Sequence, residues 1–91
     1  MYYQIHIVPI HSEVGLRFML SAAPQQAPGG SDPRVTLETW DKLAVVLGSV
    51  NIDAGLIDEA RIKAFEKGEV FNIRNVILTD EQLEKLGLKR K

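Results

Sequence analysis

The chain has no cysteine among its 91 residues. It can therefore form no disulfide, hold no metal through thiolates and use no cysteine nucleophile. It also has no apolar run near the ~20 residues that a membrane-spanning helix needs. Its first residues, MYYQIHIVPIH, lack the basic region, the long apolar core and the small-residue cleavage site of a secretory signal. We therefore expect a cytoplasmic protein without a membrane partner.

Positive and negative charges are nearly equal in number, because the chain has 11 Lys or Arg residues and 12 Asp or Glu residues. This balance gives no long-range attraction to phosphates, so nucleic acid is not an expected partner. Lys89, Arg90 and Lys91 form a basic C-terminal tail, which we interpret as solvated. The composition, 45% apolar and 25% charged, is typical of a globular protein. A chain of this length can build one core, so we predict a single α+β domain over residues 1–91.

Residues 1–21 have the composition of a β-hairpin. Tyr, Ile and Val dominate YYQIHIV, LRFML alternates apolar with polar residues, and Ser12 to Gly15 supply a turn. Pro9 has no N–H to donate, so the first strand either ends near it, bulges there, or lies at an edge. A two-stranded hairpin is marginal by itself in water. The segment 22–34, which holds three of the four prolines, is therefore predicted to be a long, mobile loop inside the domain.

Two helices are predicted after this loop. The first has Thr36 as N-cap and Gly48 as its end, and it carries an apolar stripe wider than one packing layer needs. The second begins after Asp53 as N-cap and ends at Gly68.

The segment VFNIRNVIL, residues 70–78, returns to β-type composition. It is followed by a helix with a capping box between Thr79 and Gln82 and with Gly87 as its end. The predicted order is therefore β-β-α-α-β-α. We predict a two-layer sandwich, in which a small, mostly antiparallel three-stranded sheet has helices on one face.

The period of two along a strand assigns side chains to the two faces of this sheet. If Ile5, Ile7, Phe18 and Ile73 face the helices, the opposite face presents aromatic, cationic and amide groups. A small anionic or nucleotide ligand would then be bound by Tyr2, His6, Arg17, Asn72 and Arg74. The alternatives are a plain solvated face and a protein interface.

Other residues with possible chemistry have simpler explanations. His6 and His11 differ by an odd number and fall on opposite faces of an unbroken strand, so they do not share a metal ion. Asp53 is explained as a helix cap, and Gly29 and Gly30 lack the lysine and the context of a phosphate loop. We predict no metal site, no cofactor and no catalytic residues.

The sequence therefore favours a non-enzymatic protein-interaction or oligomerisation module over an enzyme. The partner would be a second copy of the chain or another protein. The expected interface residues are Trp40, Val45 and Val46 of the apolar helix, together with Met19 of the sheet. The alternative function is a cofactor-free domain, possibly a small enzyme, that binds a small molecule or nucleotide on the uncovered sheet face.

Overall fold

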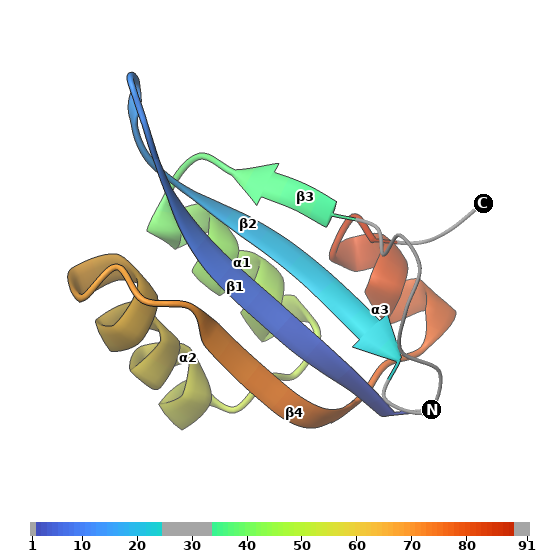
Figure 1. Cartoon of the computed structure of the whole chain (residues 1–91). Coiled ribbons are helices and arrows are strands. Elements are labelled where there is room, and N and C mark those ends of the chain that lie inside the picture. The colour runs from blue at the N-terminus through green and yellow to red at the C-terminus, as the bar shows by residue number, and fades with distance from the viewer. Residues whose placement is uncertain (1, 25–33, 89–91) are drawn as a thin grey trace.

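The computed structural model describes residues 2–24 and 34–88. It is an α+β structure whose antiparallel strands form one four-stranded sheet in the order β3-β2-β1-β4. The elements follow the chain as β1 (Tyr2–Ser12), β2 (Gly15–Pro24), β3 (Arg34–Leu37), α1 (Trp40–Ser49), α2 (Ala54–Ala60), the π-helix η1 (Arg61–Glu66), β4 (Phe71–Ile77) and α3 (Asp80–Lys85). The helices lie together on one side of the sheet (Figure 1).

The predicted N-terminal hairpin is confirmed. Strand β1 pairs with β2 from Tyr3 opposite Pro24 to Ser12 opposite Gly15, and the Ser12 hydroxyl donates a 2.8 Å hydrogen bond to the Gly15 carbonyl across the turn. The tip of this hairpin projects beyond the rest of the sheet in Figure 1. Pro9 lies inside β1, beyond the pair that Ile7 forms with Phe71, the first residue of β4. The missing N–H is tolerated there because, among the described residues, β1 has a paired strand on one side only at this point.

The prediction of three strands was wrong, because residues 34–37 form a further edge strand. Strand β3 pairs with β2 from Phe18 opposite Leu37 to Ser21 opposite Arg34. Val35 and Leu37 point into the core while Arg34 and Thr36 alternate to the other face. The predicted loop over residues 22–34 was too long at both ends, since Ala22 to Pro24 belong to β2 and Arg34 begins β3. Its predicted mobility concerns residues 25–33, which lie outside the described residues.

Helix α1 begins later than predicted. Thr39, not Thr36, is the N-cap, because its hydroxyl accepts a 3.2 Å hydrogen bond from the Lys42 N–H. Gly48 was also the wrong end, since the helix continues through it to Ser49. The left-handed residue after the helix is Asn51, with φ 63°. The N–H groups of Asn51 and Ile52 then bond the carbonyls of Gly48 and Leu47, which is a Schellman motif.

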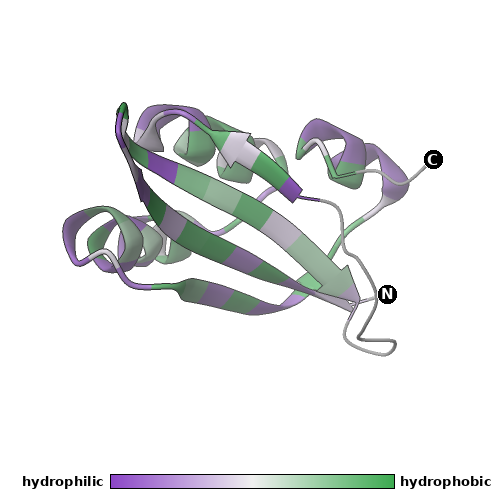
Figure 2. Cartoon of the chain, turned by 45° about the horizontal axis from the view of Figure 1, so that its top comes forward, coloured by the Kyte–Doolittle hydropathy of each residue, from purple (hydrophilic) through white to green (hydrophobic). Residues whose placement is uncertain are grey.

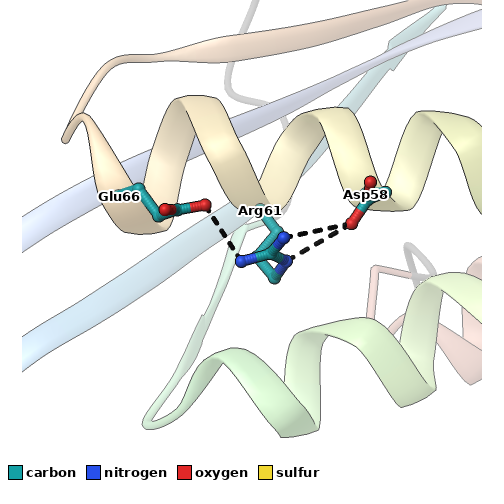
Figure 3. A network of polar contacts seen from close by, with 3 residues as sticks. All are labelled: Asp58, Arg61 and Glu66. Atoms are coloured by element: carbon teal, nitrogen blue, oxygen red, sulfur yellow. Dashed lines mark hydrogen bonds and ion pairs between the residues drawn. The ribbon is translucent and has the colours of Figure 1, made fainter.

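Asp53 is confirmed as the cap of the second helix, where its carboxylate accepts a 3.0 Å hydrogen bond from the Gly55 N–H. The helix was expected to run evenly to Gly68, but after Ala60 it widens into the π-helix η1. Arg61 bridges this junction (Figure 3). Its guanidinium contacts Asp58 at 3.3 Å and Glu66 at 2.9 Å. Both contacts are exposed and contribute little to stability.

Strand β4 contains a β-bulge, which the sequence did not reveal. Tyr3 pairs with Val76 but Ile5 pairs with Ile73, so Gln4 faces two residues, Arg74 and Asn75. Asn75 is in the left-handed region with φ 59°, which asparagine tolerates better than most residues. The capping box that opens α3 is confirmed, with both Thr79–Gln82 hydrogen bonds present.

The core lies between the sheet and the helices. It is fully apolar among the described residues, with no buried polar or charged residue. Phe18 is at its centre, only 1% exposed, with the Trp40 ring edge-on at 5.6 Å and the Phe65 ring stacked at 6.2 Å. The other fully buried large side chains are Ile5, Ile7, Leu20, Leu43 and Leu47. One face of the sheet therefore packs against the helices, and the opposite face does not take part in this core.

Candidate functional site

The sheet face opposite the helices is the first candidate site, and we call it the open face. Its side chains alternate with the buried residues of each strand. Hydrophilic and hydrophobic bands alternate in this way along β4 in Figure 2. By this alternation it comprises Tyr2, Gln4, His6, Val8, Ile10, Arg17, Met19, Ser21, Ala23, Arg34, Thr36, Asn72, Arg74 and Ile77. The five residues predicted as ligand-binding all belong to it.

A polar row crosses all four strands of the open face. The strand register places Arg34 beside Ser21, Ser21 beside His6, and His6 beside Asn72. His6 Nδ1 and Asn72 Oδ1 are 2.7 Å apart. Since the amide oxygen only accepts, His6 carries a proton on Nδ1 in this arrangement. The hydrogen bond orients the imidazole and leaves Nε2 to contact a ligand or partner.

An apolar row lies next to the polar one. Val8 pairs with Met19, Met19 pairs with Thr36, and Ile10 pairs with Arg17. The aliphatic side chains are half-buried by their neighbours on the sheet. Arg17 is also 3.9 Å from Glu38, which contacts Lys42 at 3.3 Å. These exposed ion pairs are weak, so Arg17 can exchange Glu38 for another carboxylate at small cost.

The charges of the chain are divided between its two layers. The four strands contain no Asp or Glu, and their three arginines, Arg17, Arg34 and Arg74, are all on the open face. Outside the strands the described residues include five basic side chains, Lys42, Arg61, Lys63, Lys67 and Lys85, against eleven carboxylates. A chain that is nearly neutral as a whole therefore has a cationic sheet face and an anionic remainder.

The four residues predicted as an interface do not form one surface. Met19 is on the open face, whereas Val45 and Val46 belong to α1 on the other side of the sheet. Val45 is 72% exposed and, with Leu37, Asp41, Lys42 and Val46, lines a shallow apolar groove of about 430 Å³. Trp40 is only 8% exposed and packs on Phe18. Its side chain therefore belongs mainly to the core of this chain.

Sequence reasoning missed a cavity at the β4 edge of the sheet. Its volume is about 410 Å³, and three separate segments line it. Residues 50–53 come from the connection between α1 and α2, and Leu56 comes from the first turn of α2. Residues 73–77 come from the bulged part of β4, and Gln82 comes from α3. Asn51 and Asn75, the two left-handed residues other than glycine in the described chain, both line it. An asparagine just after a predicted helix was the available signal, and only for Asn51.

The described residues contain no group of three or more His, Asp or Glu side chains placed to hold a metal ion. His11 points to the helix side of the sheet, where a Cβ on Gly68 would be 3.7 Å from its Nε2, while His6 is on the open face. None of the helices within residues 2–24 and 34–88 has the length and apolar character to cross a membrane.

Comparison of the chain with protein-family models, with curated proteins and with solved structures finds no match.

Proposed function

We propose that the protein is a non-enzymatic binding module that takes an acidic partner protein on its open face. The observation that carries this proposal is the distribution of charge. Three arginines lie on a sheet face whose strands hold no carboxylate, and no helix within residues 2–24 and 34–88 covers that face. An acidic surface would complement the open face, and the guanidinium groups suit bidentate pairing with carboxylates.

The apolar row of the open face favours a protein partner over a nucleic acid. Val8 and Met19 on the two central strands, with Ile10 nearer the hairpin tip, give the face an apolar patch, and protein interfaces use such a patch as a core surrounded by a polar rim. Single-stranded nucleic acids are bound instead through several stacked aromatic rings along a strongly basic track. Apart from the imidazole of His6, Tyr2 is the only aromatic ring of the open face among the described residues, and the chain has a net charge of −1.

Self-association through the open face is less favourable than binding to a different chain. A twofold contact places the same patch of both copies together. Arg17, Arg34 and Arg74 would then approach the arginines of the second copy, and like charges at an interface oppose association. A homo-oligomer remains the alternative partner, and light scattering at high protein concentration distinguishes it from a partner-free monomer of 10.2 kDa.

The proposal is tested with a defined probe, a fluorescent peptide in which Glu alternates with Leu. We expect the peptide to bind, with a fluorescence anisotropy change that is lost or weakened about tenfold in Arg17→Gln/Arg34→Gln. The matched control is Lys67→Gln/Lys85→Gln, which changes the net charge equally on the helix layer. Circular dichroism verifies that both double variants fold.

Three outcomes would contradict the proposal. The peptide could fail to bind, both double variants could weaken binding equally, or an oligothymidylate of similar charge could bind as tightly as the peptide. The last result would indicate a nucleic-acid module instead.

A further inference from the structure

The outer edge of strand β3 has no neighbouring strand within residues 2–24 and 34–88, because β3 is the first strand of the sheet and pairs with β2 alone. Alternate residues of a strand direct their N–H and C=O groups to the same side. Every second residue of β3 therefore presents these groups away from β2, which is a template for one more strand. The opposite edge, β4, carries the bulge at Asn75, and bulges discourage strand addition.

An apolar groove lies on the helix side of this edge. Leu37 of β3 lines it together with Asp41, Lys42, Val45 and Val46 of α1, a helix that contacts both β2 and β3. The surface of the groove is almost wholly apolar, although two of these residues are charged. Val45 is 72% exposed there. An aliphatic side chain from a strand added beside β3 would cover Val45 and remove its apolar surface from water.

The other side of the same edge is cationic. Arg34 of β3 is exposed and alternates with Val35, which packs on the core, so its side chain lies on the open face. Arg34 forms no ion pair with any other described residue. Directly opposite residues of adjacent strands have Cβ atoms ~4.5–5.5 Å apart. A carboxylate side chain on an added strand would therefore be close enough to pair with the Arg34 guanidinium.

The two sides of the β3 edge thus favour different side chains, and only an extended segment directs successive residues to both sides of a sheet. We infer that the acidic partner presents a segment in which acidic and aliphatic residues alternate, and that this segment pairs with β3 as an added strand. Its aliphatic side chains enter the groove beside Val45, and its carboxylates lie beside Arg34. This inference rests on the function proposed above and adds the position and conformation of the bound segment.

The test compares the alternating Glu-Leu peptide with two derivatives that carry methyl groups on backbone nitrogens, those of every leucine in one and those of every glutamate in the other. In a strand paired along one edge, the N–H groups of alternate residues point to the neighbouring strand and the others point away. By fluorescence anisotropy, we expect one derivative to bind at least about tenfold more weakly than the unmodified peptide and the other to bind within about threefold of it. Equal affinities of the two derivatives would overturn the inference, whether both bind or neither does.

A protein variant tests the groove. Val45→Gln should weaken binding of the unmodified peptide about fivefold, because the groove loses its most exposed apolar side chain. Val14→Gln is the matched control, since Val14 is 76% exposed and lies outside the groove. Circular dichroism verifies that both variants fold. Unchanged binding by Val45→Gln would also overturn the inference, and so would an equal loss in Val14→Gln.

Failure of this inference can be told apart from failure of the proposed function. If the unmodified peptide does not bind, the acidic-partner proposal is wrong and the added strand is wrong with it. If the peptide binds and its binding depends on Arg17 and Arg34, but the two methylated derivatives bind equally, the proposed function stands and only the added strand is overturned.

Discussion

At the scale of single residues, two asparagines have left-handed backbone conformations that most side chains avoid. Asn51 has φ 63° and Asn75 has φ 59°. Left-handed conformations crowd the Cβ atom against the following carbonyl oxygen, and asparagine offsets part of this cost through local hydrogen bonding. Both positions border the β4-edge cavity, so their conformations determine its walls as well as the stability of the fold.

Replacing Asn51 separates backbone strain from side-chain contacts. We expect Asn51→Ala to lower the free energy of unfolding by about 1 kcal/mol, because alanine is strained at positive φ. Asn51→Gly should be neutral within about 0.5 kcal/mol, since glycine adopts this conformation freely. Urea denaturation measures both. If Asn51→Gly lowered the free energy of unfolding as much as Asn51→Ala did, the asparagine side chain, and not the backbone conformation, would be what stabilises this position.

Phe18 occupies the centre of the hydrophobic core. It is 1% exposed and contacts the rings of both Trp40 and Phe65. We expect Phe18→Ala to cost about 3–5 kcal/mol, because a large cavity remains under the helices. Phe65→Ala should cost clearly less, since Phe65 is 49% exposed. Thermal and urea unfolding measure the stability of both variants. If Phe65→Ala lowered the free energy of unfolding as much as Phe18→Ala, the central role of Phe18 would be contradicted.

At the scale of elements, the sequence was most informative where local chemistry decides the outcome. The hairpin turn, the Asp53 cap and the capping box at Thr79 and Gln82 all follow from short-range hydrogen bonding, and all are confirmed. Strand β3 was missed because it has only four residues, Arg34–Leu37. Its alternation is too short to identify by pattern, and Thr36 looked like a helix cap. Pairing with β2, a tertiary contact, makes this segment a strand.

The correct N-cap of α1 can be established with isosteric substitutions. Thr39→Val should lower the free energy of unfolding by about 1 kcal/mol, because the Lys42 N–H loses its side-chain acceptor. Thr36→Val should be neutral or slightly stabilising, since valine suits a strand as well as threonine does. Chemical denaturation of both variants gives the comparison. If Thr36→Val lowered the free energy of unfolding more than Thr39→Val did, Thr36 would be the N-cap, as expected from the sequence.

At the scale of the whole molecule, the two candidate sites differ in how far they could be foreseen. The part of the open face on β1, β2 and the start of β4 could be predicted, because a period of two is enough to separate His6 and Arg17 from Ile7 and Phe18. Its Arg34 and Thr36 could not, because strand β3 was not predicted. The β4-edge cavity could not. It joins residues 50–56 to residues 73–77 and Gln82 across an intervening stretch of helix, and it depends on a bulge that changes the alternation after Arg74.

The separation of charge between the two layers predicts how binding on the open face depends on salt. An acidic peptide is attracted to the arginine face from a distance, and this attraction is screened as the Debye length falls from ~10 Å at 0.1 M salt to ~3 Å at 1 M. Raising the salt concentration should therefore slow association of the Glu-Leu peptide much more than it speeds dissociation, because long-range charge mainly controls the association rate. Stopped-flow fluorescence measures both rate constants. The salt dependence should be weaker in Arg17→Gln/Arg34→Gln and nearly unchanged in Lys67→Gln/Lys85→Gln. An association rate that is independent of salt in the unmodified protein would mean that the aliphatic row around Val8 and Met19, and not the arginines, recruits the partner.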